Sequence, residues 1–447
     1  MSDGRKRKFI LKGFSKLIKE DKLKIVAEMM DNQVETVELL KSFWHKDIDK
    51  QKVFDEFSEN TISNFYIPYG VAPNFIVNDK AYLAPLVIEE SSVVAAASSS
   101  ARFWSEHGGF RAEIKGVTKI GQVHFIWGGD IKKLRFVFDE LKLFLRDRAK
   151  SITANMEKRG GGILDFELVD LRDKIDDYYQ IRVSFDTQDS MGANFINSCL
   201  EEFAVSMKDF FNEKDIFKGK EKDCKIVMSI LSNYTPDCLV KTWVECDISE
   251  LDNIDNELSG KEFVEKFQLA VRIAEIDPYR ATTHNKGIFN GIDAVAIATG
   301  NDFRAIEAAG HTFAARDGSY GSLSHVEIEG DRFKFYVEVP LAMGTVGGLT
   351  SLHPLAKHSL KMLGKPSAEE LMMIASAVGL ANNFAALRSL VTKGIQIGHM
   401  KMHLMNILNN FNATKPEKKR SVEYFMDHKV SFSSVEQYLN ELRGAKK

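Results

Sequence analysis

The chain has 447 residues, enough for two or three domains with a sizeable hydrophobic core. Its 60 basic residues nearly balance its 63 acidic ones, so the composition gives no preference for nucleic acid or for a membrane surface. The four cysteines lack the close spacing of metal sites, and no N-terminal stretch has signal-peptide character. We therefore expect a cytoplasmic protein without a metal site, with reduced thiols at Cys199, Cys224, Cys238 and Cys246.

The first 90 residues divide into two parts that differ in composition and in the spacing of apolar residues. In residues 1–50 the apolar residues, among them Leu23 and Val26, are spaced as in amphipathic helices. Residues 57–90 are rich in Ile, Val, Tyr and Phe, which predicts strands, and Asn78-Asp79 is a turn signal that predicts a hairpin.

Two adjacent acids, Glu89 and Glu90, end the second strand of this hairpin, and a run of Ala and Ser follows (VVAAASSSARFW). The run predicts a helix with little side-chain bulk, suited either to close helix packing or to the approach of a flat ligand. We expect one of the two acids to be partly buried at this junction, where a carboxyl group can be tuned for general acid catalysis.

Residues from Ile114 to about Met228 predict a small α+β domain, an antiparallel sheet with helices on one face. Expected strands alternate with two long helices. The strands are 112–117, 122–127, 163–171 and 178–187, and the helices are 131–158 and 191–211.

Glycines mark both helices of this domain. Gly160-Gly161-Gly162 follows the first helix, as is typical of a C-terminal cap. The sequence DSMGAN (189–194) opens the second helix, where a glycine lets a phosphate approach free backbone N–H groups. This pattern is not the GxGxxG fingerprint, so it gives no indication of a Rossmann fold.

The stretch from Asp277 to Gly310 sets a group of polar residues among small and apolar ones. We expect a buried strand at Ala294–Ala298, a turn at 299–302 and a helix beginning at Asn301 or Asp302. Such a connection either presents polar side chains to a ligand or is an ordinary structural link. The polar residues are Arg280, His284, Lys286, Asn290 and Asp302.

The remaining segments predict a strand at 333–341, a glycine-rich loop at 342–348 and a helix that begins with the capping box Ser367…Glu370. The uncharged run 371–387 is too short and too polar to span a membrane, so we expect a buried helix. Gly398-His399-Met400 begins a polar, amphipathic C-terminal segment, for which we expect a separate subdomain.

Seven of these motifs, in this order, resemble those of 3-hydroxy-3-methylglutaryl-CoA (HMG-CoA) reductase of the soluble, bacterial type (class II). The resemblance covers residues from about 10 to 430. It implies two reductions by a nicotinamide cofactor, which take HMG-CoA to mevalonate and release CoA, or the reverse reaction. The motifs are ENTIS (59–63), VIEESSVVAAAS (87–98), DSMGAN (189–194), DPYRATTHNKG (277–287), ATGNDFRA (298–305), GTVGG (344–348) and GHMKMH (398–403).

The resemblance also implies the fold, an α+β architecture with three parts. A large mixed substrate-binding domain comprises residues 1–115 and 233–392, and a small ferredoxin-like, non-Rossmann cofactor domain, 116–232, is inserted into it. Residues 393–447 form a C-terminal helical flap. The active site then lies at the interface of a homodimer.

Four catalytic roles follow from the resemblance. Lys286 stabilises negative charge on the thioester oxygen, and Asp302 lies beside it and keeps it charged. Glu90 supplies a proton during reduction of the aldehyde. His399 protonates the departing CoA thiolate, a task that suits an imidazole at neutral pH.

Binding roles are implied for other positions. Arg280 binds the free carboxylate of the substrate, and Ser92 and Asn290 contact the substrate. Thr153 stands seven residues before the triple glycine, where relatives that use NADH carry an acid, so we expect NADPH rather than NADH, aided by Arg148, Lys150 and Ser151. The implied cofactor-binding residues are Asp189, Met191, Gly192, Ala193, Asn194, Asn233 and Thr153.

Two alternatives differ in class from a reductase. One is a catalytically silent CoA- or nucleotide-binding protein of the same fold. The joint presence of Glu90, Lys286, Asp302 and His399 argues against it. The other is an acyl-CoA hydrolase or transferase, but no nucleophilic Ser or Cys is paired with a base in these motifs.

Overall fold

The structure is a computed structural model, and it describes residues 11–252, 254, 258–392 and 404–444. The implied catalytic residue His399 lies outside the described residues. The chain forms two compact units, Met1–Pro68 and Tyr69–Lys447. The division into domains expected from the sequence stays a prediction.

The first unit is helical, as the apolar spacing predicted. Its helices are α1 (Lys19–Ala27), α2 (Gln33–Ser42) and α3 (Ile48–Asp55). Asn32 and Asp47 cap α2 and α3, since their side chains accept hydrogen bonds from backbone N–H groups of the first turn. The segment after α3, which was expected to begin the strands, contains none before Pro68.

The second unit begins with the predicted hairpin, β1 (Tyr69–Val77) and β2 (Lys80–Val87). Asn78 and Asp79 form its turn with φ of 47° and 64°, left-handed values that suit Asn and Asp in a two-residue hairpin loop. Helix α4 (Ser91–Ser105) follows directly and packs on β1.

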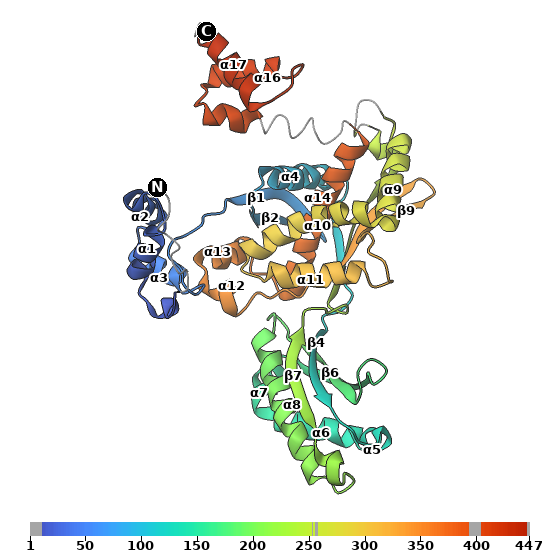
Figure 1. Ribbon diagram of the computed structural model, residues 1–447. Coiled ribbons are helices and arrows are strands. Elements are labelled where there is room, and N and C mark those ends of the chain that lie inside the picture. Colours follow the sequence, from blue (N-terminus) through green and yellow to red (C-terminus); the bar gives the residue numbers. More distant parts are fainter. Residues whose placement is uncertain (1–10, 253, 255–257, 393–403, 445–447) are drawn as a thin grey trace. The chain divides into compact units, whose positions relative to one another are not determined.

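A larger antiparallel sheet, in the order β3-β8-β10-β9, anchors the main core. Some of the helices around it contact this sheet, and the others pack against helices or against β2 (Figure 1). The strands are β3 (Arg111–Ile114), β8 (Leu239–Asp247), β9 (Ser324–Glu329) and β10 (Arg332–Pro340). The helices are α9 (Gly260–Ile276), α10 (Pro278–Ala298), α11 (Phe303–Ala314), α12 (Gly348–Leu352), α13 (Pro354–Met362) and α14 (Ala368–Val391).

Helix α14 is the central helix of this core. Its predicted capping box is present, with Ser367 and Glu370 each bonded to the other's backbone N–H. Within the described chain it is the one helix long and apolar enough to cross a membrane, but 78% of its apolar window is buried inside the structure. The expectation of a buried core helix is therefore confirmed.

Two sequence predictions in this part are wrong. Ala294–Ala298 is the last turn of the 21-residue helix α10 and not a strand, because a short apolar run buried on all sides has no period that separates the two structures. The segment 112–117 was assigned to the small domain, but β3 pairs with β8 of the larger sheet.

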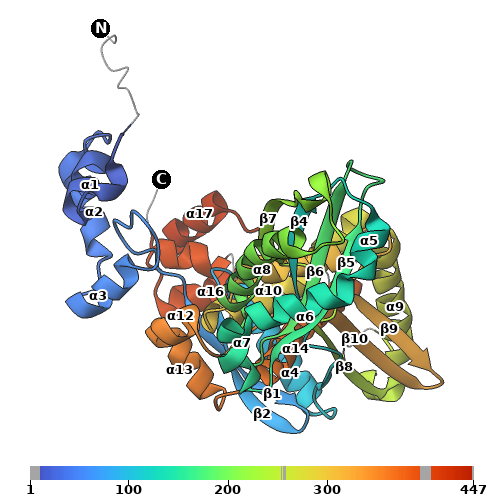
Figure 2. The ribbon, with the colours of Figure 1, turned by 90° about the horizontal axis from the view of Figure 1, so that it is seen from below.

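The small domain has its own core and an antiparallel sheet in the order β5-β6-β4-β7. With a helix after the first strand and another after the third, this order is the ferredoxin-like arrangement that the family resemblance implied. Alternate residues of β4 and β6 are buried, so the helices cover one face, and α8 runs beside β7 and β4 (Figures 1 and 2). The strands are β4 (Lys119–Ile126), β5 (Gly162–Asp170), β6 (Tyr178–Asp186) and β7 (Lys225–Ser232).

Three helices replace the single one predicted over 131–158: α5 (Ile131–Phe136), α6 (Phe138–Arg148) and α7 (Lys150–Glu157). Helix α8 (Ala193–Glu213) is the second long helix, as predicted. The four cysteines are buried free thiols, and burial raises the pKa to about 12 for Cys199, Cys224 and Cys246 and to about 11 for Cys238. Such thiols are unreactive at neutral pH.

The described part of the C-terminal segment is helical, as the resemblance implied. It includes α16 (Lys415–Tyr424) and α17 (Phe432–Leu442), capped by Thr414 and Ser431. These helices share a small apolar core of their own, which includes Leu408, Phe425 and Val435.

Candidate active site

Helix α10 carries much of the implied site. It begins at Pro278, with Asp277 as its cap, and runs for 21 residues. Lys286 and Asn290 lie one turn apart on the same face. The Nζ of Lys286 is 3.7 Å from Oε2 of Glu90, so the structure brings together two implied catalytic groups that are far apart in the sequence.

The pair stays accessible to a ligand, because 63% of the Lys286 side chain and 39% of the Glu90 side chain are exposed. An ion pair this open contributes about 0–1 kcal/mol to folding. Its position therefore matters for chemistry more than for stability.

Glu90 occupies the N-terminal cap position of α4, the helix of small residues that follows β2. Its Oε1 accepts a hydrogen bond from Oγ of Ser92, and its other oxygen faces Lys286. The adjacent Glu89 is exposed. The expectation that one of the two acids is partly buried is confirmed, and that acid is Glu90.

Arg280 is half-buried in the first turn of α10. Burial lowers the pKa of its guanidinium below the ordinary value, but the group remains charged at neutral pH. No carboxylate pairs with it in the part of the chain that the structure describes. A partly desolvated cation without an anionic partner favours an anionic ligand, such as a carboxylate.

His284 has a structural environment. Its Nε2 lies 2.6 Å from Oγ of Ser324, whose hydroxyl in turn donates to Oδ1 of Asn383 at 2.8 Å. Burial, reinforced by the charge of Arg280, lowers the pKa of His284 to about 3, so the ring is neutral. The network ties α10 to β9 and α14 beneath the site.

Asp302 caps α11 by accepting from the backbone N–H groups of Arg304 and Ala305. Its carboxylate also binds the Arg304 guanidinium at 3.0 and 3.1 Å. Burial acts to raise the pKa of Asp302, but the hydrogen bonds from Arg304 and Ala305 and the charge of Arg304 together lower the pKa below the ordinary value. Among the described residues Asp302 is paired with Arg304 and not with Lys286, so the expected contact between Asp302 and Lys286 is not formed here.

A pair of carboxyl groups between α10 and α11 was not identified from the sequence. Asp293 of α10 faces Glu307 of α11, and its Oδ1 is buried without a hydrogen-bond partner among the described residues. Burial, together with the negative charge of Glu307, raises the pKa of Asp293 to about 8. At neutral pH the Asp293 carboxyl group therefore keeps its proton.

We expect Asp293→Asn to remove a pH dependence of stability. Because the folded pKa of Asp293 lies above its unfolded value, the stabilisation is complete at low pH and is lost as pH rises towards about 8. An asparagine does not ionise and can still donate to Glu307. Thermal unfolding followed against pH should show the variant more stable than the parent above about pH 8, by roughly 1–3 kcal/mol.

If the stability of parent and variant varies with pH in the same way across this range, the raised pKa of Asp293 is contradicted. Asp317→Asn is the matched control, because this exposed acid lies just beyond α11 and makes only a surface ion pair.

The DSMGAN motif forms a turn that leads into α8. Gly192 is its cap with φ of 87°, and a Cβ there would lie 2.4 Å from the Thr187 side chain, so only glycine fits. Asp189 accepts from the backbone N–H of Ala368 at 2.7 Å and, through its carbonyl, from that of Thr345 at 2.8 Å. Its side chain thus docks the motif onto the start of α14, and its carbonyl docks it onto the glycine-rich loop.

The other implied cofactor residues differ in accessibility. Met191, Gly192 and Ala193 are half-buried, whereas Asn194 and Asn233 are exposed. Thr153 is only 1% exposed in α7, so its side chain does not face solvent or a ribose. Two exposed cations precede it in the chain, each paired with an acid: Lys150 with Asp147 at 2.6 Å and Arg148 with Asp209 at 3.7 Å.

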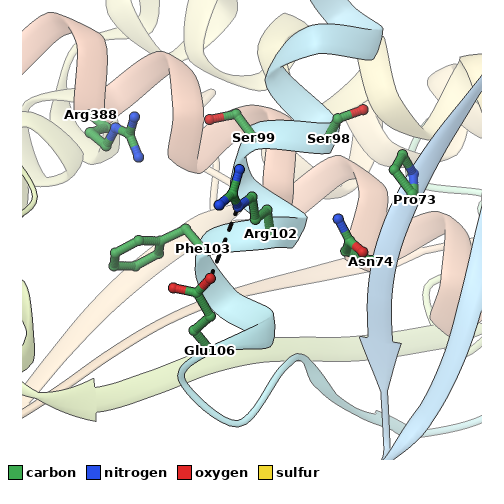
Figure 3. Close-up of a pocket in the computed structure, with 8 residues that line it drawn as sticks. All are labelled: Pro73, Asn74, Ser98, Ser99, Arg102, Phe103, Glu106 and Arg388. Carbon is green, nitrogen blue, oxygen red and sulfur yellow. Dashed lines mark ion pairs between the residues drawn. The ribbon is translucent and has the colours of Figure 1, made fainter.

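A cavity of about 530 Å³ lies beside the second half of α4, towards the end opposite Glu90. Figure 3 shows Arg102 and Ser99 from α4 with Arg388 from α14 around it. Arg102 is 4.0 Å from Glu106. Two guanidinium groups and several hydroxyl and amide groups make this cavity suited to anionic groups of a ligand. The lining residues are Pro73, Asn74, Ser98, Ser99, Arg102, Phe103, Glu106 and Arg388.

Fold and site together define a class of protein, an α+β enzyme with a ferredoxin-like domain and a lysine–glutamate pair beside small-residue and glycine-rich segments. Comparison with known proteins defines it further. The sequence model of the family described as hydroxymethylglutaryl-coenzyme A reductase matches residues 19–404. The chain belongs to this family, and it is an NAD(P)H-dependent oxidoreductase with HMG-CoA reductase activity.

Individual relatives agree over nearly the whole chain. The 3-hydroxy-3-methylglutaryl-coenzyme A reductase of Archaeoglobus fulgidus is 38% identical over 96% of this chain and 94% of its own length. A probable reductase of the same name from Borreliella burgdorferi is 33% identical, with 92% of each chain covered. The class II enzyme of Streptococcus pneumoniae, solved with NADPH in open conformations, is 36% identical, with a TM-score of 0.70 over 85% of this chain and 99% of that one. The implied α+β fold class and the class II resemblance are thereby confirmed.

Proposed function

We propose that this chain reduces HMG-CoA to mevalonate with NADPH at a site made by Glu90, Lys286, Arg280 and, outside the described residues, His399. The observation that carries the proposal is the Lys286–Glu90 pair, an accessible cation 3.7 Å from an accessible acid. Hydride attack on a thioester puts negative charge on the carbonyl oxygen. A cation aimed at that oxygen is usually the largest catalytic contribution.

In this scheme the bound nicotinamide supplies hydride, and the side chains manage charge and protons. Lys286 polarises the thioester carbonyl, and Glu90, steadied by Ser92, holds the proton that the aldehyde oxygen needs in the second reduction. His399 protonates the CoA thiolate when the C–S bond breaks. Asp302 remains a proposed member of the site through its position at the start of α11.

Arg280 and the cavity beside α4 account for the two ends of the substrate. The guanidinium of Arg280 binds the free carboxylate of HMG-CoA. Arg102 lies twelve residues beyond Glu90, roughly 18 Å along the helix, and the small side chains between them leave room for an extended pantetheine arm. The cavity at Arg102 and Arg388 then receives the phosphate groups of CoA.

The homodimer with its site at the subunit interface, and a location in the cytoplasm, also stand as proposals. They rest on the family and on the composition of the chain. Sedimentation equilibrium of the purified protein measures the first, and a monomer under conditions of full activity would contradict it.

NADPH is the proposed cofactor. Streptococcus pneumoniae reductase binds it, and the exposed cations of α6 and α7 suit a 2′-phosphate. Because Thr153 is buried, a carboxylate there is a poor probe of the ribose site. Lys150 at the start of α7 is the better one, because 75% of its side chain is exposed.

We expect the parent to oxidise NADPH on addition of HMG-CoA, and Lys150→Glu to lower kcat/KM for NADPH by about tenfold while that for NADH changes little. The absorbance of the reduced nicotinamide measures both rates. Lys174→Glu, another exposed lysine of the same domain, is the control. A parent that prefers NADH tenfold would contradict NADPH as the cofactor. So would a Lys150→Glu variant whose kcat/KM falls equally for both cofactors. Oxidation of neither cofactor would sink the proposed function.

A further inference from the structure

Lys119, the first residue of β4, is a buried cation that no motif identified. Only 4% of its surface is exposed. Its Nζ donates to Oγ1 of Thr187 at 2.7 Å and lies 3.4 Å from the carbonyl oxygen of Ser190. Within the described chain no carboxylate lies at ion-pair distance from it; Asp186 and Asp189 attract it from further away.

A buried ammonium with only neutral oxygens as partners is costly, by several kcal/mol, unless charge nearby compensates it. The nearest ionisable groups that face it are Asp186, Asp189 and the thiol of Cys238. Burial lowers the pKa of Lys119 and these three groups oppose that shift. The contacts of Lys119 within the fold do not compensate the cost of burying its charge, so we look for its role in ligand binding.

The partners of Lys119 are the framework of the turn before α8. The Thr187 hydroxyl, which accepts from Lys119, donates to the Ser190 carbonyl at 2.6 Å. The backbone N–H and hydroxyl of Ser190 both donate back to the Thr187 carbonyl at 3.0 Å. Gly192 then passes against the Thr187 side chain and opens α8, so the position of Thr187 fixes where the free N–H groups of the helix point.

We infer that Lys119 is a positioning residue for the dinucleotide: it holds the Thr187–Gly192 turn and places a positive charge beneath the N-terminus of α8, where the diphosphate of the cofactor lies. The inference rests on the proposed function, which puts the cofactor at residues 189–194. Lys119 acts through Thr187 and through its charge, and it needs no direct contact with the ligand. The diphosphate in turn supplies the negative charge that the buried ammonium lacks.

The test is direct binding of NADPH, followed by the fluorescence of the reduced nicotinamide, with the full-length protein. Lys119→Met keeps the length of the side chain and removes its charge. We expect its Kd for NADPH to rise about tenfold or more, with KM for HMG-CoA unchanged and kcat at saturating cofactor within about twofold of the parent. Lys115→Met, an exposed lysine four residues earlier, is the control.

A second measurement needs no variant. Because burial lowers the pKa of Lys119, the parent should bind NADPH more weakly as pH rises through the alkaline range and the ammonium loses its proton. Lys119→Met should lack this rise in Kd. A purely structural lysine gives no such dependence, so a flat parent profile overturns the inference even if the variant fails to fold.

Asn194→Asp tests the location of the cofactor separately from the role of Lys119, since it adds an exposed negative charge to the first turn of α8. Weakened NADPH binding in Asn194→Asp with parent-like binding in Lys119→Met overturns the role of Lys119 alone. Parent-like binding in Asn194→Asp overturns the location of the cofactor, and with it the inference.

Discussion

Replacement of Lys286 by alanine is expected to lower kcat for HMG-CoA reduction by at least ~10²–10³-fold, the usual cost of one lost oxyanion donor. The ammonium lies 3.7 Å from Glu90 on an accessible face of α10, where a thioester oxygen can reach it. Affinity for NADPH should change little, because the cofactor motif is on α8. Steady-state rates and NADPH fluorescence titration measure the two quantities.

The variant should remain folded, because an ion pair as exposed as Lys286–Glu90 adds little to stability. Lys261→Ala on α9 removes a lysine away from the site and serves as the control. A Lys286→Ala rate within tenfold of the parent would show that another group polarises the carbonyl.

His399→Gln is expected to separate the two half-reactions. If His399 protonates the departing CoA thiolate, it is needed where a C–S bond breaks and not in the reduction of free mevaldehyde, which contains no thiolate. General acid catalysis is typically worth roughly 10²–10⁴-fold. We expect turnover of HMG-CoA to be nearly abolished, while mevaldehyde is reduced at close to the parent rate.

The competing explanation is that His399 only packs its own segment, so that both activities fall together in His399→Gln. Assay of the two substrates with one enzyme preparation distinguishes these cases. His428→Gln, in the same C-terminal segment, is the matched control, since that ring stacks on Tyr424 and bonds to its carbonyl. Equal losses with both substrates would rule out the acid role.

Much of the fold followed from local sequence signals. The Ser367…Glu370 capping box, the Asn78-Asp79 turn and the strand alternation in the small domain all have short-range causes and were predicted correctly. Ala294–Ala298 was not, because an apolar run inside a fully buried helix shows no amphipathic period. The partner of β3 was also missed, since strand pairing is a long-range choice.

The site residues likewise include some that local sequence motifs identified and others that they could not identify. Glu90 and Lys286 were singled out from motifs, and the structure pairs them. The Asp293–Glu307 pair gave no signal, because its character depends on the crossing of α10 and α11 and on burial. Thr153 was chosen by counting from a glycine, and a count along a helix does not tell which residues face inward.

The central claim is a four-electron reduction of a thioester at one site, and its stoichiometry is the most direct test. With limiting HMG-CoA and excess NADPH, the cofactor oxidised is followed by its absorbance and the CoA released by its thiol. The account predicts two NADPH consumed for each thiol released, with mevalonate as the product. Thiol release without cofactor oxidation, as a hydrolase would give, or no release at all, would contradict it.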